Sequence, residues 1–455
     1  MRIYYGFSQD QSTYLEKRDN SRGRSLGVSQ AKRRRRVGTL AKQPLTDTAA
    51  QDEWRATRAA LEQLPPRRWQ PQQLARVAGL ETSRFGVVFE EHRHTTARVG
   101  LTAARGRAAR QQLLSSAEPV ETVAAACGLT VRALNRNLLD QTGLDCAATR
   151  SLLGAPNFTL RLPPRFRVAE TMAYLTRDPR SLNIRGSGDR AFAFGLAIGE
   201  RAVSAVCQFD ADAKELQVEV LQRGRQRDDA AIHVADALAR MLGLASGTKQ
   251  LENLARREEL MRRLIGPRRG MRIPLTAAPV DALTWSILGQ QINLPFAYEL
   301  LRTTTALCGL RAPERLYTMP IPARIAQTPE SAFTSRKMSR SKARYLVDIA
   351  SAAASGTLNL TALAEGSFAT AYETLTALRG IGPWTANYTL MRGLGFADCA
   401  PIGDAGLRRA LRRFDHLETP PDDAEMVRLM ARFRPFRSLA TFHLWRGSDD
   451  ALPTG

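Results

Sequence analysis

The stretch LRGIGPWTANYTLMRGLG, residues 378–395, places two glycines directly before a proline and two aromatic residues. Gly380 and Gly382 permit a tight turn, and Pro383 suits the first position of the helix that follows. Trp384 and Tyr388 then lie one helical turn apart on the same face. The backbone N–H groups of such a turn can bind a phosphate, although an ordinary connection between two helices has the same pattern.

Asp404 follows Gly382 by 22 residues. It lies in APIGDAGLRRALRRF, between a loop that contains proline and glycine and a basic amphipathic helix. A carboxylate at this position can stabilise a developing positive charge and orient a water molecule. Aspartate is also a favoured N-cap, and the two roles are compatible.

The charge balance indicates a polyanionic partner. The 455 residues include 66 Lys and Arg against 44 Asp and Glu, a formal charge of +22, and 44% of the chain is hydrophobic. A folded, strongly basic chain of this length predicts several domains and favours nucleic acid as the partner.

The cysteines and the chain start exclude several classes of protein. The five cysteines are scattered, with no C-x-x-C pair that would indicate a zinc or iron–sulfur site. The first residues, MRIYYGFSQDQSTYLEKRDN, lack the apolar core of a signal peptide, and no window is apolar enough for a membrane helix. We therefore expect a cytoplasmic, nucleoid-associated chain of bacterial type with no metal.

Residues 1–51 are predicted to form a basic, disordered arm. The first 44 residues hold eleven Lys or Arg and three acidic residues, including KRRRR at residues 32–36. Such a segment either contacts DNA without sequence preference or is a solvated leader with no role.

Residues 52–153 show helical periodicity and an internal repeat. LARVAGL at residues 74–80 matches VAAACGL at residues 123–129, and Gly79 and Gly128 are 49 residues apart. Each copy predicts a helix, a Gly-Leu turn and a second helix, with a basic helix between the copies. This pattern resembles the double helix-turn-helix region of AraC-type regulators. The alternative is a helical scaffold that only positions its neighbour.

The AraC-type resemblance implies DNA contacts at the start of each second helix. The residues at those positions are Ser83, Arg84, Arg132, Asn135 and Arg136.

The remaining chain divides into an α+β region and a helical region. Over residues 156–251 the period changes to two in FTLRL, LNIRG, AFAFGLAI, AVSAVCQFD and ELQVEVLQ, with two helical runs among them. Residues 252–448 are predicted to be helical, and residues 449–455 form a tail. The fold class is therefore multidomain and mainly α.

The helical region resembles the helix-hairpin-helix glycosylase superfamily, and residues 156–448 together resemble its AlkA-type branch, 3-methyladenine DNA glycosylase II. The resemblance rests on five sequence motifs, which are L-x-G-I-G-x-x-T-A, P-x-G-D, ILGQQIN at residues 287–293, SRSKARYLVDIA and RPFRSLATFHLW. The expected fold is an all-α domain after a small α+β domain.

The resemblance implies a role for each matching residue. Asp404 corresponds to the catalytic aspartate of the family. Its aromatic base pocket is matched here by Trp384, Tyr388 and Trp445. Gly380 and Gly382 bind DNA, and Gln291 is the wedge that enters the duplex. For the aromatic residues the alternative is core packing; Gln291 could be an ordinary polar residue, with Ile292 as the wedge.

The same resemblance predicts a monofunctional enzyme that removes alkylated bases from double-stranded DNA by base flipping. Trp384 occupies the place where bifunctional relatives carry a lysine, so no lyase step is expected. We expect a monomer with no cofactor, and at most a structural monovalent cation at the hairpin. The competing hypothesis is an AraC-type transcription regulator whose glycosylase-like part is a silent DNA clamp.

Overall fold

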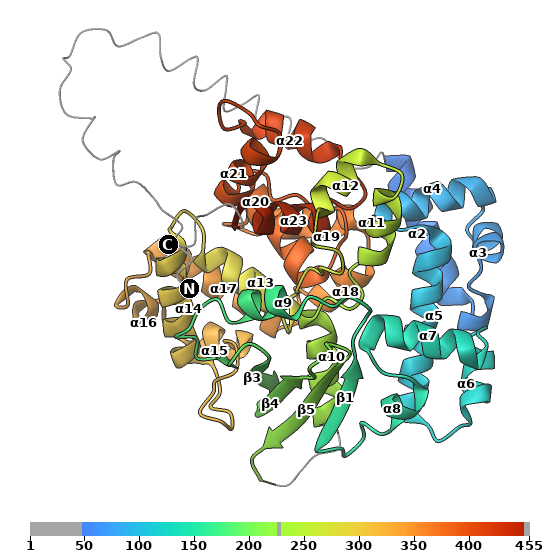
Figure 1. Cartoon of the computed structure of the whole chain (residues 1–455), viewed down its shortest axis with the longest axis horizontal. Coiled ribbons are helices and arrows are strands. Elements are labelled where there is room, and N and C mark those ends of the chain that lie inside the picture. Colours follow the sequence, from blue (N-terminus) through green and yellow to red (C-terminus); the bar gives the residue numbers. More distant parts are fainter. Residues whose placement is uncertain (1–47, 225–228, 450–455) are drawn as a thin grey trace.

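The computed structural model describes residues 48–224 and 229–449, and Figure 1 shows three regions in chain order. We call them the N-terminal module (48–153), the sheet domain (156–247) and the helical domain (248–449). Most of the predicted arm and tail lies outside the described residues. The first helix begins at Thr48, a few residues before the boundary expected at residue 52.

The N-terminal module consists of short helices around two small cores. One core surrounds Phe85 and Phe89, and the other surrounds Leu134 and Leu138. The elements are α2 (Thr48–Gln63), η1 (Pro66–Arg68), α3 (Pro71–Val77), α4 (Thr82–Arg93), α5 (Ala97–Ser115), α6 (Val120–Ala126), α7 (Val131–Thr142) and α8 (Cys146–Arg150).

The two halves of the module repeat the same turn. Gly79 and Gly128 adopt φ angles of 69° and 66°, a left-handed conformation that favours glycine. The turn after α3 is closed by a hydrogen bond from Leu80 N to Ala75 O, and the turn after α6 by the equivalent bond from Leu129 N to Ala124 O, each 2.9 Å long. The 49-residue repeat seen in the sequence is therefore a repeat of backbone structure.

The sheet domain contains the strands that the alternating pattern predicted. They are β1 (Asn157–Arg161), β2 (Ile184–Ser187), β3 (Ala191–Ile198), β4 (Arg201–Phe209) and β5 (Glu215–Gln222), in the antiparallel order β1-β5-β4-β3-β2. Phe192, Phe194 and Phe209 are buried in one core with Val234 and Leu238 of α10 (Ala230–Met241). Before β2, the chain forms α9 (Val168–Leu175), whose Tyr174 packs against the core of the helical domain.

The helical domain is built from short helices divided by Gly and Pro, and its described residues form no strand beyond an isolated bridge between Arg311 and Tyr317. The elements are α11 (Thr248–Ala255), α12 (Glu259–Ile265), α13 (Pro279–Leu288), α14 (Leu294–Cys308), α15 (Pro322–Gln327), α16 (Glu330–Thr334), α17 (Arg340–Ala354), α18 (Leu360–Glu365), α19 (Phe368–Ala377), α20 (Pro383–Thr389), the π-helical turn η2 (Leu390–Leu394), α21 (Ala405–Phe414), α22 (Asp423–Ala431) and α23 (Arg437–Asp449).

The N-terminal module packs against both following domains. After α4, the His94 ring lies 4.8 Å from the Phe368 ring, and Arg93 Nη1 donates to Ala364 O at 2.9 Å. Arg110 of α5 forms a 2.8 Å ion pair with Asp236 of α10. Because Arg93 and His94 are half-buried and make specific contacts here, the module is docked rather than tethered. Burial lowers the pKa of His94 to about 4.

All five cysteines are buried and unpaired. Within residues 48–224 and 229–449, no cluster of His, Cys, Asp and Glu could hold a metal ion. No helix in these ranges is long and apolar enough to cross a membrane.

Candidate active site

The predicted hairpin joins α19 to α20, and its two glycines have different surroundings. Gly380 has a φ of +85°, and a Cβ built there would lie 2.4 Å from the Tyr345 ring. Gly382, the N-cap of α20, has an ordinary φ of −91°, and a Cβ there would meet no protein atom within 4 Å. Gly380 is therefore required by the fold, whereas Gly382 leaves its backbone open to a ligand.

The hairpin is bound to the turn that follows α13. Gln290 Nε2 donates to Gly380 O at 2.8 Å and to Thr385 Oγ1 at 2.9 Å. Lys342 of α17 donates from Nζ to Leu288 O at 2.7 Å and to Gln290 O at 3.0 Å. Burial lowers the pKa of Lys342. The sequence reasoning missed Gln290 and Lys342, although both lie in the quoted motifs ILGQQIN and SRSKARYLVDIA.

Gln291 is the exposed residue of that same turn. Its φ of +55° places it in the left-handed region, which is uncommon for a residue with a side chain. The next residue, Ile292, is half-buried and packs against the core of the helical domain. Between the two wedge candidates, Gln291 is the one whose side chain faces solvent.

Asp404 is held by three N–H donors at the start of α21. Its Oδ1 accepts from Leu407 N at 2.7 Å, which makes it the N-cap, and from Trp445 Nε1 at 3.1 Å. Its Oδ2 accepts from Trp384 Nε1 at 3.3 Å. Since the donors come from α20, α21 and α23, the tertiary fold fixes the orientation of the carboxylate.

Two of the three predicted pocket aromatics, Trp384 and Trp445, contact this carboxylate, and the third, Tyr388, packs against Trp384. Trp384 and Tyr388 lie on one face of α20, with ring centroids 5.6 Å apart. Trp384 and Trp445 are half-buried, whereas Tyr388 is 7% exposed and lies on the inner side. Burial raises the pKa of Tyr388, so its hydroxyl stays protonated at neutral pH.

Beyond Tyr388 the aromatic cluster continues into residues that the sequence reasoning did not identify. Tyr174 helps to raise the pKa of the buried Tyr388, and its hydroxyl group accepts a hydrogen bond from Arg392 of η2. Arg177 lies over the Tyr174 ring at 4.2 Å from the centroid. Tyr174 and Arg177 belong to the sheet domain, and no local motif connects them to α20.

The residues of the N-terminal module that are predicted to contact DNA are either exposed or bound to other parts of the module. Ser83, Arg132 and Arg136 are exposed. Arg84 Nε donates to Glu53 Oε2 at 2.9 Å, and this hydrogen bond holds the pKa of Glu53 below its usual value.

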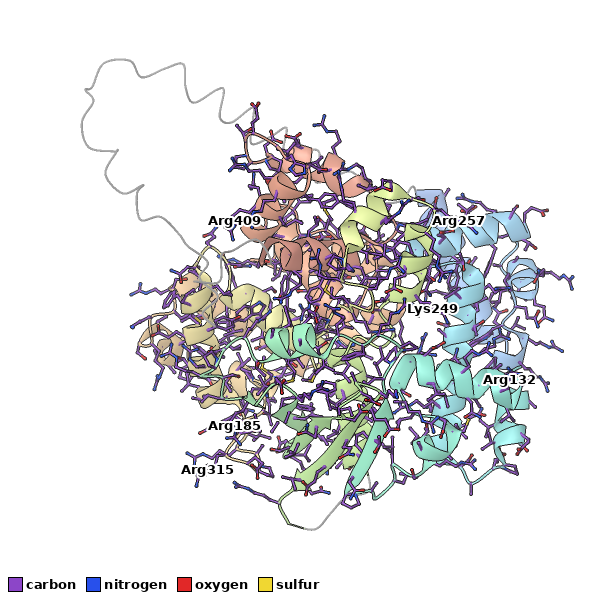
Figure 2. The ribbon with its side chains drawn as sticks, viewed as in Figure 1. Arg132, Arg185, Lys249, Arg257, Arg315 and Arg409 are labelled. Carbon is purple, nitrogen blue, oxygen red and sulfur yellow. The ribbon has the colours of Figure 1, made fainter. Side chains whose placement is uncertain are left out.

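Asn135 also has a contact inside the module, since its Oδ1 accepts from Cys146 N at 2.9 Å. Arg132 lies on the side of the module remote from Arg409 of α21 in Figure 2. The module therefore presents basic side chains of its own, apart from the Asp404 site.

The hairpin, the aspartate at the start of the following helix and the all-α surroundings define a helix-hairpin-helix glycosylase fold. Residues 284–435 match the family model described as HhH-GPD superfamily base excision DNA repair protein. The 3-methyladenine DNA-glycosylase from Archaeoglobus fulgidus superposes with a TM-score of 0.57 at 22% identity, covering 65% of this chain and 99% of that one.

Proteins with similar sequences carry the names of DNA glycosylases or DNA repair enzymes. The DNA-3-methyladenine glycosylase of Bacillus subtilis (strain 168) is 37% identical over 169 residues, 36% of this chain and 56% of that one. A Mycobacterium tuberculosis (strain H37Rv) protein named "Probable bifunctional transcriptional activator/DNA repair enzyme AlkA" is 31% identical over 189 residues, 41% of this chain and 36% of that one.

The chain spans about half the length of the first curated relatives that it matches. It carries an HhH-GPD glycosylase domain whose homologues are 3-methyladenine glycosylases. The family match begins at residue 284, so the N-terminal module lies outside it, and the AraC-type resemblance of that module stays a prediction.

Proposed function

We propose that this protein is a monofunctional DNA glycosylase that flips an alkylated base out of double-stranded DNA and hydrolyses its N-glycosidic bond. The observation that carries the proposal is the convergence of Trp384, Trp445 and a helix N-terminus on the carboxylate of Asp404. The aromatic rings stack on the extruded base, and Asp404 stabilises the positive charge that develops on the sugar.

DNA binding follows from the surfaces beside this carboxylate. Gly382 and the start of α20 can accept a phosphate at an unobstructed backbone, and Gln291 projects from the adjacent turn to fill the space that the flipped base leaves. Ser83, Arg132 and Arg136 of the N-terminal module add phosphate contacts elsewhere on the duplex. We propose that the chain acts as a monomer and needs no cofactor; a monovalent cation at the hairpin stays a prediction.

The absence of a lyase step is part of the proposal. A lyase needs an amine that attacks the sugar, and Trp384 stands where bifunctional relatives carry that lysine. Lys342 lies close to the hairpin, but its ammonium group is directed at two backbone carbonyl groups. The product is therefore an intact abasic site.

The test incubates the full chain with methylated duplex DNA and measures free bases by chromatography. Released 3-methyladenine, with no protein–DNA adduct after borohydride reduction, is the expected result. If duplex DNA is bound but no base of any kind is released, the competing hypothesis of a regulator with a silent clamp replaces this one. A borohydride-trapped adduct would contradict the monofunctional step alone.

A further inference from the structure

The two copies of the repeat in the N-terminal module have different residues on their outer faces. Helix α7 is the equivalent of α4, since both span 12 residues and occupy the same place in their copies. The exposed residues of α7 are Arg132, Arg136 and Asp140, and the matching exposed residues of α4 are Ser83, Val87 and Glu91. At these positions α4 carries no cation, so its outer face attracts a phosphate backbone less than that of α7 does.

The ends of the two helices differ in a second way. Each helix ends at a residue in the left-handed conformation, with a φ of 75° at Gly143 after α7 and of 53° at His94 after α4. Glycine adopts this conformation without strain, whereas a residue with a side chain rarely does. The first copy keeps a strained helix end where the second copy has the residue that relieves it. Such strain points to a function of the His94 side chain.

The His94 ring lies at a junction of segments that build the candidate active site. It is 4.8 Å from the Phe368 ring and 6.2 Å from the Phe396 ring, and those two rings are 5.8 Å apart. Phe368 is the first residue of α19, the helix that ends at the hairpin. Phe396 follows η2 on the segment that leads to Asp404, and its carbonyl oxygen accepts from Ser438 Oγ of α23 at 2.6 Å. One ring of the module therefore contacts two of these segments directly and a third through Phe396.

Arg93 contacts the same junction. Its Nη1 donates to Ala364 O at 2.9 Å and to Gly366 O, at the end of α18 and directly before the N-cap of α19. Hydrogen bonds from a charged guanidinium group are strong, and the carbonyl groups at a helix end carry partial negative charge. The Arg93 guanidinium carbon is also 5.8 Å from the centroid of Phe396. Arg93 and His94 thus bind the start of α19 and Phe396 together.

We propose that the end of α4 positions the active site, with Arg93 and His94 as positioning residues for excision. They hold the start of α19 and Phe396, and these segments fix the hairpin and Asp404 relative to each other. The inference rests on the proposed glycosylase function and adds to it two residues that lie outside the family match. Both side chains are part of the packing of the helical domain, so changes in them act as changes in that domain, on excision more than on attraction to DNA.

The experiment compares the full chain with Arg93→Met and His94→Gly on methylated duplex DNA. His94→Gly gives α4 the residue type that ends α7, so it relieves the backbone and removes only the ring. Each variant should lower the single-turnover rate at saturating protein about tenfold, while affinity for undamaged duplex stays within about twofold of wild type. Arg93→Lys keeps a charged donor for the carbonyl groups and should restore the rate to within about threefold of wild type.

A charge-matched control separates positioning from a general loss of positive charge. Arg98→Gln removes an exposed arginine at the start of α5, lowers the net charge as Arg93→Met does, and should leave the rate unchanged. Circular dichroism and melting temperatures establish that each variant is folded at the assay temperature. If His94→Gly does not fold, His94→Asn removes the ring and tolerates the left-handed φ. Wild-type rates within twofold in folded Arg93 and His94 variants would overturn the inference, and so would equal losses of rate and of affinity for undamaged duplex.

A second measurement does not depend on excision. The affinity for duplex with an abasic-site analogue, divided by that for undamaged duplex, reports how well the hairpin and the pocket accept an extruded nucleotide. Arg93→Met and His94→Gly should lower this ratio about fivefold, and an unchanged ratio would overturn the inference. If the wild-type chain released no base of any kind, the proposed function would fail, and this ratio alone would decide the positioning role.

Discussion

The helical domain and the N-terminal module use their polar side chains in opposite ways. In the helical domain, donors from three helices converge on the carboxylate of Asp404. In the module, Arg84 and Asn135 bind neighbouring parts of the module itself, while Arg132 and Arg136 extend separately into solvent.

This difference separates a place for chemistry from a place for holding DNA. Catalysis needs groups fixed with respect to one another, since a small displacement lowers the rate strongly. Attraction to a phosphate backbone needs charge near the surface and tolerates mobile side chains. The comparison therefore predicts that changes in the helical domain act mainly on excision, and that changes in the module act mainly on salt-dependent binding.

Among the variants outside Asp404, the largest effect is expected from the pocket indoles. Trp384→Ala or Trp445→Ala should slow excision about 100-fold, because stacking on the flipped base and one donor to Asp404 are both lost. Affinity for undamaged duplex should change much less, because stacking operates only after flipping. Single-turnover rates and titrations on the same DNA measure both quantities. Parallel losses in the two would assign the indoles to core packing.

The hairpin glycines form a matched pair. Gly380→Ala should lower the free energy of unfolding by about 2 to 3 kcal/mol, because it combines a left-handed φ with a clash against Tyr345. Gly382→Ala should leave thermal stability unchanged and weaken DNA binding, since the added Cβ meets only the ligand. Calorimetry and binding titrations distinguish the two variants. Equal effects of both on stability would show that Gly382 is not kept open for DNA.

His94 tests the contact between the two regions. Its folded-state pKa of about 4 is below its unfolded value near 6.5, so the neutral form stabilises docking. This contribution to stability is complete well above pH 6.5, decreases as the pH falls below 6.5, and is fully lost once the pH has fallen through 4. Between pH 7 and pH 5 the loss amounts to about 2 kcal/mol.

His94→Asn removes the titrating group and keeps a side chain that tolerates the left-handed φ of 53°. The melting temperature of the variant should therefore depend less on pH over this range. Burial also lowers the pKa of His92 and His443, so the difference between wild type and variant is the relevant quantity. Identical pH profiles for the two chains would contradict the docking role.

The smallest effect is expected in the module. Arg132→Gln combined with Arg136→Gln should leave excision at low salt nearly unchanged. The slope of log affinity against log salt should fall by about 2, because two phosphate contacts are removed. Asn135→Ala should instead lower stability by about 1 kcal/mol, since Cys146 N loses its acceptor. An unchanged salt slope in the double variant would remove the module from the DNA-binding surface.

The sequence predicted those features that depend on local patterns. Alternation identified the strands β1 to β5, and the spacing of Gly380, Pro383 and Trp384 identified the hairpin. The loop before α21 identified Asp404, because an N-cap has a local signature.

Contacts between distant segments could not be predicted in this way. Gln290 reaches Gly380 across 90 residues, and Arg392 reaches Tyr174 across 218. Arg84 and Asn135 illustrate the same limit, because a helix-turn-helix pattern locates the helix and not the partner that each side chain finds.

The most direct test of the central claim is the single-turnover excision rate of Asp404→Asn on methylated duplex DNA. The substitution keeps the size of the side chain and an oxygen that can cap α21, but it removes the negative charge. Asp422→Asn is the matched control, because Asp422 caps α22 in the same way. We predict a loss of about 100-fold to 1000-fold for Asp404→Asn, with duplex affinity equal to or above that of wild type, and a normal rate for Asp422→Asn. Release of methylated adenine by Asp404→Asn at near wild-type rate would contradict the account.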